Sequence, residues 1–371
     1  MLLARRDLTV ARGRFLLMGT VVALIALLGV LLAGLAVGLV DAGTSGLERL
    51  PVTHLAFQPG AESTFSRSFI PSDAADRLRG DGVLRTAPMG VSLFNAQHDR
   101  GAGQPANVVD VALFGVERES FLAPKVTSGS QLSGSGPAPV VISTQLLDEG
   151  VKVGDRLVVG LDQVALEVVG VSDVGTYGHV PVAYTDLPTW EQVTPGATTQ
   201  TGRGLVSAVA LQLRPDAAPS AVGDRAGLEV VTKQTSFNGS PGYVAETATM
   251  TLIRAFLLVI SALIVAAFFS VWTVQRRDQI GLLKAMGASD RYVVVDAMTQ
   301  VLMLLVVATV VGSLLGIVLG SFVPDEAPFI LQPAAVVLAA VALVVAGLIG
   351  SLVAVRRITA VDPLVALGSN R

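Results

Sequence analysis

Four long segments without a charged residue constrain the fold of this chain more than any other feature. They are Phe15–Val40, Ala255–Val274, Ala297–Val323 and Ala334–Val355. Each reaches the roughly 20 apolar residues that a helix needs to cross the hydrocarbon core of a bilayer. About 200 residues of ordinary composition separate the first two segments, enough for one or two domains. The sequence therefore predicts a membrane protein with several spans and a large polar insertion.

A cleavable signal peptide is the alternative for the first segment, because Arg5, Arg6, Arg12 and Arg14 precede it. The apolar part of a signal peptide usually has only about 7–15 residues. The segment Phe15–Val40 is longer, and no convincing small-residue cleavage site follows it. We therefore expect a retained membrane helix.

Composition excludes several classes of function. The chain has no cysteine, which excludes disulfides, thiolate metal sites and cysteine nucleophiles. Its 26 Lys and Arg against 29 Asp and Glu leave no basic domain of the kind that binds nucleic acid. The three histidines, His54, His98 and His179, do not have the spacing of a zinc site on a helix. We expect no bound metal.

Basic residues in short loops indicate the cytoplasmic side of a membrane. Four precede the first segment, four lie in 275–292 and three lie in 356–371, whereas 324–333 has none. We therefore expect a multi-pass protein of the bacterial plasma membrane with both termini in the cytoplasm. The large insertion, with 14 basic and 22 acidic residues in 41–249, would lie outside.

The expected fold class is an α-helical membrane protein with four transmembrane helices and a large extracytoplasmic α+β domain between the first and second. The expected order is a cytoplasmic N-terminus (1–14), helix (15–40), outer domain (41–249), helix (250–274), cytoplasmic loop (275–292), helix (293–323), outer loop (324–333), helix (334–355) and cytoplasmic tail (356–371). Apolar runs with strand periodicity in the outer domain are Val52–Phe57, Val108–Val116, Val140–Ser143, Arg156–Val159, Val164–Val171, Val180–Tyr184, Val206–Leu213 and Leu228–Thr232. Short helices fit Pro71–Leu78 and Thr144–Glu149.

No motif for catalysis appears in the chain. There is no Gly-Lys dipeptide, so a Walker A lysine is absent, and no G-x-S-x-G elbow of a serine hydrolase follows a strand. We expect that the chain is not an enzyme by itself. If ATP drives its work, a partner must bind the nucleotide.

The loop after the second apolar segment is the most informative part of the sequence. It reads QRRDQIGLLKAMGAS over Gln275–Ser289 and predicts a short amphipathic helix that ends at Gly287. Such a helix could lie in the membrane interface. The string, however, resembles the QRxxEIGxLKAxGAS segment of the FtsX-like, MacB-like family of ABC transporter permeases (type VII). Asp278-Gln279 stands where many relatives have Glu.

The order of spans and outer domain also resembles that family. The resemblance implies a permease subunit that works as a homodimer in the lipid bilayer with two copies of an ABC ATPase, which would bind ATP and magnesium. It further implies that the loop docks on the ATPase and transmits its movement mechanically. The residues expected to do so are Arg277, Gln279, Ile280, Leu283, Lys284 and Met286.

Small residues recur at helical spacing in the spans. Gly312, Gly316 and Gly320 share one face of the third, and Gly34 and Gly38 share one face of the first. Small residues let two helix backbones approach closely. Packing within one subunit and a seam between two subunits both remain open.

A candidate cargo site precedes the second span. Tyr243, Glu246, Met250 and Arg254 would share one helix face, and an acidic residue at a membrane edge is a functional candidate. An ordinary helix surface is the alternative. The stretch from Pro241 to Glu246, together with Tyr177–Val182, resembles the branch of haem exporter (HrtB-type) and DevC-type permeases.

That resemblance implies haem as the cargo, taken from the membrane at a cleft between two permease copies. Glu246 would be the main haem contact, with Tyr243, Met250 and Arg254 beside it, and His179 would either take part or be structural. The haem would be transient, because the chain has no C-x-x-C-H attachment motif and we expect no intrinsic cofactor. Export of a lipid, lipoprotein or antimicrobial peptide, and signalling to a cell-wall hydrolase without transport, are the alternatives. The docking loop argues against an anchored receptor or membrane enzyme.

Overall fold

The computed structural model describes residues 12–99, 107–132, 138–198, 204–276, 281–282, 286–324 and 327–359. The chain divides into two compact units. Leu39–Glu246 form one, here termed the inserted unit. Met1–Gly38 and Thr247–Arg371 form the other, termed the helical unit.

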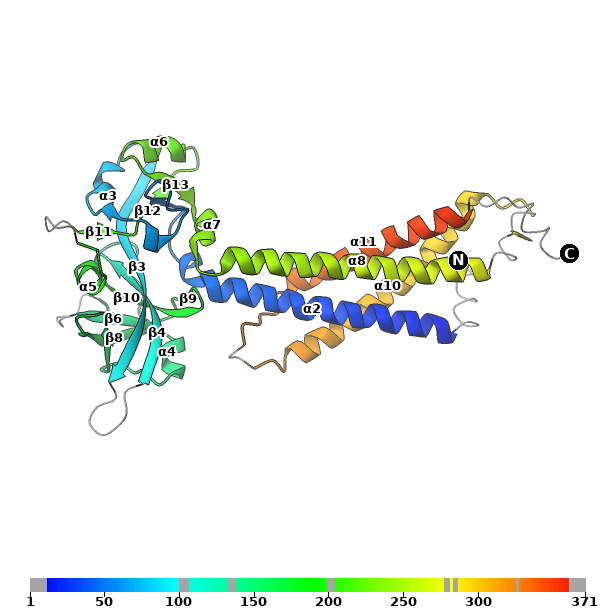
Figure 1. Cartoon of the computed structure of the whole chain (residues 1–371), viewed down its shortest axis with the longest axis horizontal. Helices are drawn as coiled ribbons and strands as arrows, with labels where there is room; N and C mark the ends of the chain where they lie inside the picture. Colours follow the sequence, from blue (N-terminus) through cyan, green and yellow to red (C-terminus); the bar gives the residue numbers. More distant parts are fainter. Residues whose placement is uncertain are drawn as a thin grey trace. The chain divides into compact units, whose positions relative to one another are not determined.

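In the described residues the helical unit contains most of four long helices: α2 (Arg12–Glu48), α8 (Tyr243–Gln275), α10 (Asp290–Gly320) and α11 (Pro333–Thr359) (Figure 1). Each is long and apolar enough to cross a membrane. The end of α2 from residue 39 and the start of α8 up to residue 246 belong to the inserted unit. The expected fold class is confirmed, since an α+β domain lies in the chain between the first and second of these helices.

Two helices extend beyond the expected spans. The helix α2 continues to Glu48 rather than ending at Val40, and α8 begins at Tyr243, before the expected span at 250 but where the predicted helix face from Tyr243 to Arg254 begins. The expected bounds of the two spans follow the apolar segments of the sequence. Polar residues mark the end of an apolar segment, but they do not end a helix unless they supply a stop signal such as proline.

Glycines bring α10 close to α2 within the helical unit. A Cβ atom on Gly312 would overlap the carbonyl oxygen of Ala23, and one on Gly316 would lie 2.9 Å from the Cβ of Val30. Larger residues at these positions would therefore push the two helices apart. In the structure this spacing serves packing within one chain.

The segment before α11 fills the gap left by other glycines. A Cβ atom on Gly320 would lie 2.9 Å from the Phe329 ring, and one on Gly34 would lie 2.6 Å from the same ring. The N–H of Ile330 donates to the Gly34 carbonyl at 3.1 Å. Phe329 thus packs against both α2 and α10.

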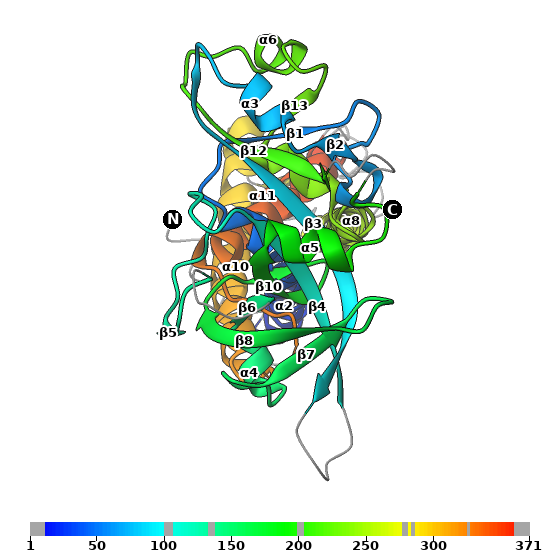
Figure 2. The same cartoon turned by 90° about the vertical axis from the view of Figure 1, so that its left-hand side faces the viewer.

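The inserted unit is built on one long sheet (Figure 2). In the described residues the strand order is β13-β1-β12-β3-β4-β10-β6-β8-β5, with β7 beside β3 and β8 and with β9 beside β10. The pairs β10–β4 and β6–β8 are parallel. The strands are β1 (His54–Phe57), β3 (Val83–Asp99), β4 (Asn107–Val116), β5 (Ser128–Gly129), β6 (Pro139–Ser143), β7 (Arg156–Val159), β8 (Val164–Ser172), β9 (Thr176–Tyr177), β10 (Val180–Asp186), β12 (Ala208–Leu213) and β13 (Glu229–Thr232); a separate pair joins β2 (Ile70–Pro71) and β11 (Leu205–Val206).

Short helices complete the unit: α3 (Ala74–Arg77), α4 (Gln145–Asp148), α5 (Leu187–Val193), α6 (Pro219–Asp224), α7 (Lys233–Ser236) and the 3-10 turns η1 (Phe65–Arg67) and η2 (Phe237–Gly239).

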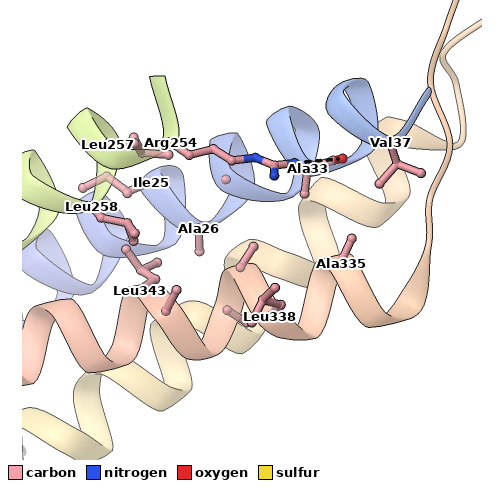
Figure 3. Close-up of a pocket in the computed structure, with 14 residues that line it drawn as sticks. Ile25, Ala26, Ala33, Val37, Arg254, Leu257, Leu258, Ala335, Leu338 and Leu343 are labelled. Carbon is pink, nitrogen blue, oxygen red and sulfur yellow. Dashed lines mark hydrogen bonds between the residues drawn. The ribbon is translucent and has the colours of Figure 1, made fainter. Parts of the chain in front are cut away.

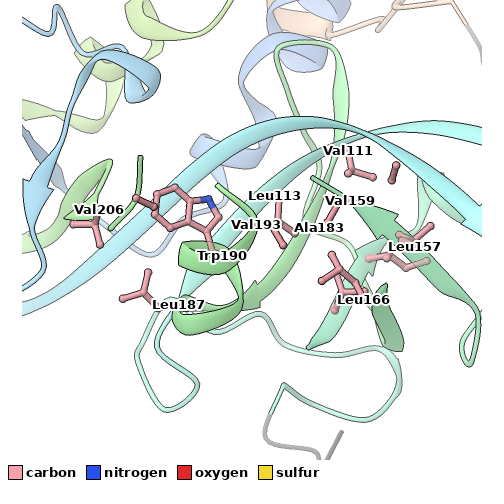
Figure 4. Packing of buried hydrophobic residues seen from close by; sticks show 14 of the residues in the cluster. Val111, Leu113, Leu157, Val159, Leu166, Ala183, Leu187, Trp190, Val193 and Val206 are labelled. Carbon is pink, nitrogen blue, oxygen red and sulfur yellow. The ribbon is translucent and has the colours of Figure 1, made fainter. Parts of the chain in front are cut away.

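Both faces of the sheet are buried, because the central strands alternate between two apolar clusters. In β4, Val111 and Leu113 enter one cluster while Ala112 and Phe114 enter the other. Trp190 of α5 belongs to the first cluster, part of which Figure 4 shows. Period-two alternation with apolar residues on both faces explains why these strands have nearly continuous apolar sequences.

A strand lies within each predicted run of the inserted unit, but the sequence reading missed the longest strand, β3. Its run contains Pro88 and Gly90, which usually argue against a central strand. Pairing with β4 begins at Met89, one residue after the proline. Gly90 is required because a Cβ atom there would overlap the ring of Trp190.

We expect that Asp186→Ala lowers the free energy of unfolding by about 1–2 kcal/mol. The Asp186 carboxylate accepts a bond from the Thr189 N–H at 2.9 Å, which caps α5, and a bond from Arg118 Nε at 2.8 Å. Burial alone would raise the pKa of Asp186, but the bonds from Thr189 and Arg118 outweigh it and lower that pKa. The loss should be measured by urea unfolding of the purified chain, followed by tryptophan fluorescence.

Because the folded-state pKa is lowered, the carboxylate stabilises the fold above its ordinary pKa and loses this effect as the pH falls below about 4. The gap between wild type and Asp186→Ala should therefore narrow on acidification. Asp216→Ala, at an exposed carboxylate, is the control with little expected effect. An equal gap at pH 3 and pH 7 would contradict this account.

Candidate functional site

The candidate site lies in the inserted unit, where α8 begins. The N–H of Glu246 donates to the carbonyl of Gly242 at 2.9 Å and so belongs to the first turn of the helix. Gly242 has a φ of +82°, which favours glycine. The carboxylate of Glu246 faces the loop between β9 and β10.

His179 meets Glu246 from that loop. Its Nε2 lies 2.9 Å from Oε1 and 3.1 Å from Oε2 of the carboxylate. The His179 side chain is 34% exposed and that of Glu246 is 32% exposed. The imidazole and the carboxylate are therefore in contact with each other, and both remain partly accessible to a ligand.

The β9–β10 loop is fixed by bonds to the end of α2. The N–H groups of Gly178 and His179 donate to the carbonyls of Gly43 and Ala42 at 2.9 and 3.0 Å. His179 has a φ of +66°, which is uncommon for any residue with a side chain. The backbone bonds hold the residue in this conformation and so direct its ring toward Glu246.

The segment before α8 is held by the same part of α2. The hydroxyl of Ser240 donates to the Gly43 carbonyl at 2.6 Å, and that of Tyr177 donates to the Gly239 carbonyl at 3.3 Å. Burial raises the pKa of Tyr177, which keeps its hydroxyl protonated as a donor. Both hydrogen bonds therefore fix the segment that leads into α8.

The structure distributes the other predicted cargo residues along α8. The ring of Tyr243 packs edge-on against that of Phe237, with centroids 6.2 Å apart. Met250 is partly exposed one turn after Glu246. Arg254 follows another turn later and belongs to the helical unit, as Met250 does.

Arg254 lines a cavity of about 260 Å³ in the helical unit (Figure 3). Its Nη2 donates to the carbonyls of Leu32 and Ala33 at 3.4 and 3.3 Å. The cavity lies among α2, α8 and α11 and is otherwise apolar, lined by Ile25, Ala26, Gly29, Ala33, Val37, Leu257, Leu258, Ala335, Leu338, Ala339, Ala340, Ala342 and Leu343.

Most of the predicted docking residues lie outside the described residues: Arg277, Gln279, Ile280, Leu283 and Lys284. Met286 is described, and its side chain is 70% exposed. Gly287 follows with a φ of +94°, and the Ser289 hydroxyl accepts a bond from the Tyr292 N–H at the start of α10. Gly287 thus has the left-handed conformation that a helix-ending glycine requires.

Within the described residues no group of three or more His, Asp or Glu side chains could hold a metal ion. The buried His98 pairs with Asp155 through a 2.8 Å contact between β3 and the turn before β7. This contact joins two neighbouring parts of the sheet, and the His98 side chain is 1% exposed.

The sequence left open whether His179 takes part in the site, and it did not place His179 against Glu246, which is 67 residues away. The signal was present in Tyr177-Gly178-His179, a Gly-containing turn between two apolar runs, but no local pattern reveals what a turn contacts. The resemblance singled out both segments without placing them together.

Comparison with known proteins gives matches over the whole chain. Residues 251–363 match the family described as FtsX-like permease C-terminal. The chain is 23% identical over 366 residues to the putative hemin transport system permease protein HrtB of Staphylococcus haemolyticus, with 99% of each chain covered. It is 25% identical over 370 residues to an uncharacterized ABC transporter permease of Mycobacterium tuberculosis, with 98% of each chain covered.

Two solved structures cover about half of the chain. The extracellular domain of the noncanonic ABC-type transporter YknZ from Gram-positive bacteria matches with a TM-score of 0.34 and 16% identity, covering 49% of this chain and 98% of that one. The periplasmic region of MacB from Actinobacillus actinomycetemcomitans matches with a TM-score of 0.34 and 13% identity, covering 50% of this chain and 90% of that one.

We expect His179 and Glu246 to be coupled by about 0.5–1 kcal/mol, the range for a partly exposed pair. The measurement is a double-mutant cycle of His179→Asn and Glu246→Gln in urea unfolding of the purified chain. Asparagine tolerates a positive φ, so the backbone of the turn should persist. Replacing Glu246→Gln by Glu229→Gln, at an exposed strand residue, gives the control, whose effects should simply add. Additivity in the first cycle would show that the contact contributes nothing.

Proposed function

We propose that this chain, an ABC transporter permease of the FtsX-like and HrtB-like type, expels haem from the membrane with ATP hydrolysed by a partner subunit. The resemblance carried by QRRDQIGLLKAMGAS is confirmed, since the matched family region includes that loop. The chain is accordingly a membrane-embedded transporter subunit.

The observation that supports haem is the likeness, over nearly the whole chain, to proteins named as hemin transport permeases. Their identity to this chain is 22–23%. At this level the cargo of a relative can differ, so the proposal also depends on what the site offers chemically. Imidazole, phenol and thioether groups are all ligands of haem iron in proteins.

Those groups occur around the start of α8. Glu246 and His179 are about one-third exposed and adjacent, and Tyr243 lies one turn earlier on the helix. In our proposal haem enters from the outer leaflet, separates Glu246 from His179 and gains contacts with Glu246, Tyr243 and Met250. Arg254 would attract the haem carboxylates.

Transport would follow from a change between two packings of a homodimer. ATP and magnesium bound by two ATPase subunits would close that partner, and the 275–292 loop would pass the movement to α8 and α10. Both termini would be cytoplasmic and the inserted unit extracytoplasmic. ATP can drive such a cycle because it stabilises one packing over the other.

We expect Glu246→Ala to weaken haemin binding at least tenfold, because it removes the main proposed contact. The measurement is a titration of the purified full chain with haemin, followed by the Soret absorbance. Glu229→Ala removes a glutamate from an exposed strand position of the same unit and should titrate like wild type. Identical curves for wild type and Glu246→Ala would show that Glu246 does not contact haem. Absence of a Soret shift in wild type would refute haem as the cargo.

We expect Leu283→Asp and Lys284→Asp to reduce haem efflux from cells at least tenfold, because both would disrupt docking on the ATPase. The level of the protein in the membrane should stay unchanged. Leu161→Asp makes the same change at a leucine that is 87% exposed in the inserted unit and should export normally. Normal efflux from the two loop variants would refute the docking role.

A further inference from the structure

The cavity beside Arg254 extends along the helices that line it and is termed the channel below. Its lining on α2 runs through Ile25, Gly29, Ala33 and Val37, residues four apart on one helix face. At 1.5 Å per residue this face extends about 18 Å. Figure 3 shows the lining side chains of α2, α8 and α11 turned toward the same space.

Small side chains create the space. Alanine or glycine supplies about half of the lining, including Ala26, Gly29 and Ala339. Large residues on α8 and α11, Leu258 and Leu343 among them, close the other sides. A volume of about 260 Å³ is below the roughly 300–1,000 Å³ of sites for drug-sized ligands. It suits one flexible chain better than a broad planar ring system.

Arg254 supplies the charged side chain of the lining. It is the single charged residue in the sequence from Thr247 to Gln275. Its guanidinium points along α2 toward Ala33, as Figure 3 shows, and its two bonds to backbone carbonyls are long, at 3.3 and 3.4 Å. A guanidinium carries more donors than these bonds use, and a charge-assisted bond to an anion is shorter and stronger.

A cation in a membrane helix is costly, and such residues pair with an anion, face a protein interior or lie near the interface. Glu246, the acidic residue before Arg254 on α8, is engaged by His179 in the inserted unit. The lining thus combines one cation with an uncharged space that follows a helix, which matches an amphiphile with one anionic head and one tail.

We propose that this cavity binds a single-chain anionic amphiphile, with its head on Arg254 and its tail between α2, α8 and α11. The head can be a carboxylate, as in a fatty acid, or a phosphate, as in a lysophospholipid. This inference rests on the proposed function in one respect: Arg254 is also a proposed haem contact, so the two ligands share that residue. Binding needs neither ATP nor the partner, so it can be tested separately from haem export.

The test uses the full chain in nanodiscs of phosphatidylcholine and the fluorescent fatty acid cis-parinaric acid. Wild type should bind it saturably, and Arg254→Gln should weaken binding about tenfold, while Arg254→Lys retains most of it. Ala339→Leu should block binding because it fills the channel. Val337→Leu changes an exposed residue of α11 outside the lining and should bind like wild type.

The methyl ester of the probe should bind more weakly than the acid to wild type and should respond little to Arg254→Gln. Displacement by laurate identifies a carboxylate head, and displacement by lysophosphatidylglycerol identifies a phosphate head. Absence of saturable binding, equal binding of acid and ester, or equal displacement by a neutral single-chain detergent would each overturn the proposal. The haemin titration of Glu246→Ala is unaffected by any of these outcomes, so failure of this site and failure of haem export remain distinguishable.

Discussion

The hydrocarbon core of a bilayer offers no partner to a backbone N–H or C=O group, and the helical unit follows from this constraint. Its spanning segments must be helices, because only a helix pairs all of its own backbone groups. Apolar side chains gain little from leaving lipid for another helix, so close packing has to hold the helices together. Gly312 and Gly316 provide it by letting α10 approach α2. Small residues on α2 and α11 also line the cavity beside Arg254.

The inserted unit is stabilised by a different effect, the burial of both faces of a long sheet. Strand periodicity is a local property, and the sequence located the strands that carry it. It missed β3 because Pro88 and Gly90 look like breaks, and their compatibility depends on contacts far away in the chain. Gly90 makes room for Trp190, whose position is set by α5. The end of the first helix was predicted too early for a related reason. The loss of apolar character at Val40 shows where a lipid-facing surface ends, whereas the backbone hydrogen bonds of α2 continue to Glu48.

In the candidate site, too, local patterns could be recognised in the sequence, whereas contacts between distant residues could not. Glu246 could be selected from the sequence because an acidic residue shortly before an apolar helix is conspicuous, and its relation to Tyr243 follows from helical spacing. Whether His179 belongs to the site stayed open, because its contact with Glu246 depends on the β9–β10 turn reaching α2 and α8 together. The channel beside Arg254 was also hidden, since its wall combines residues from three separate helices. Sequence patterns reveal which face a residue occupies, whereas the partner of that face is a property of the folded chain.

The β9–β10 turn has a mechanical consequence. Its backbone N–H groups hold α2 at Ala42 and Gly43, while the His179 ring holds the first turn of α8. A slide of α2 past α8 by one residue, about 1.5 Å, would lengthen hydrogen bonds of 2.9–3.0 Å beyond their useful range. Within the inserted unit the end of α2 and the first turn of α8 therefore contact the same turn, and an axial displacement of one relative to the other strains these bonds. The turn thus couples the end of α2 to the first turn of α8 for as long as the contact between histidine and glutamate persists.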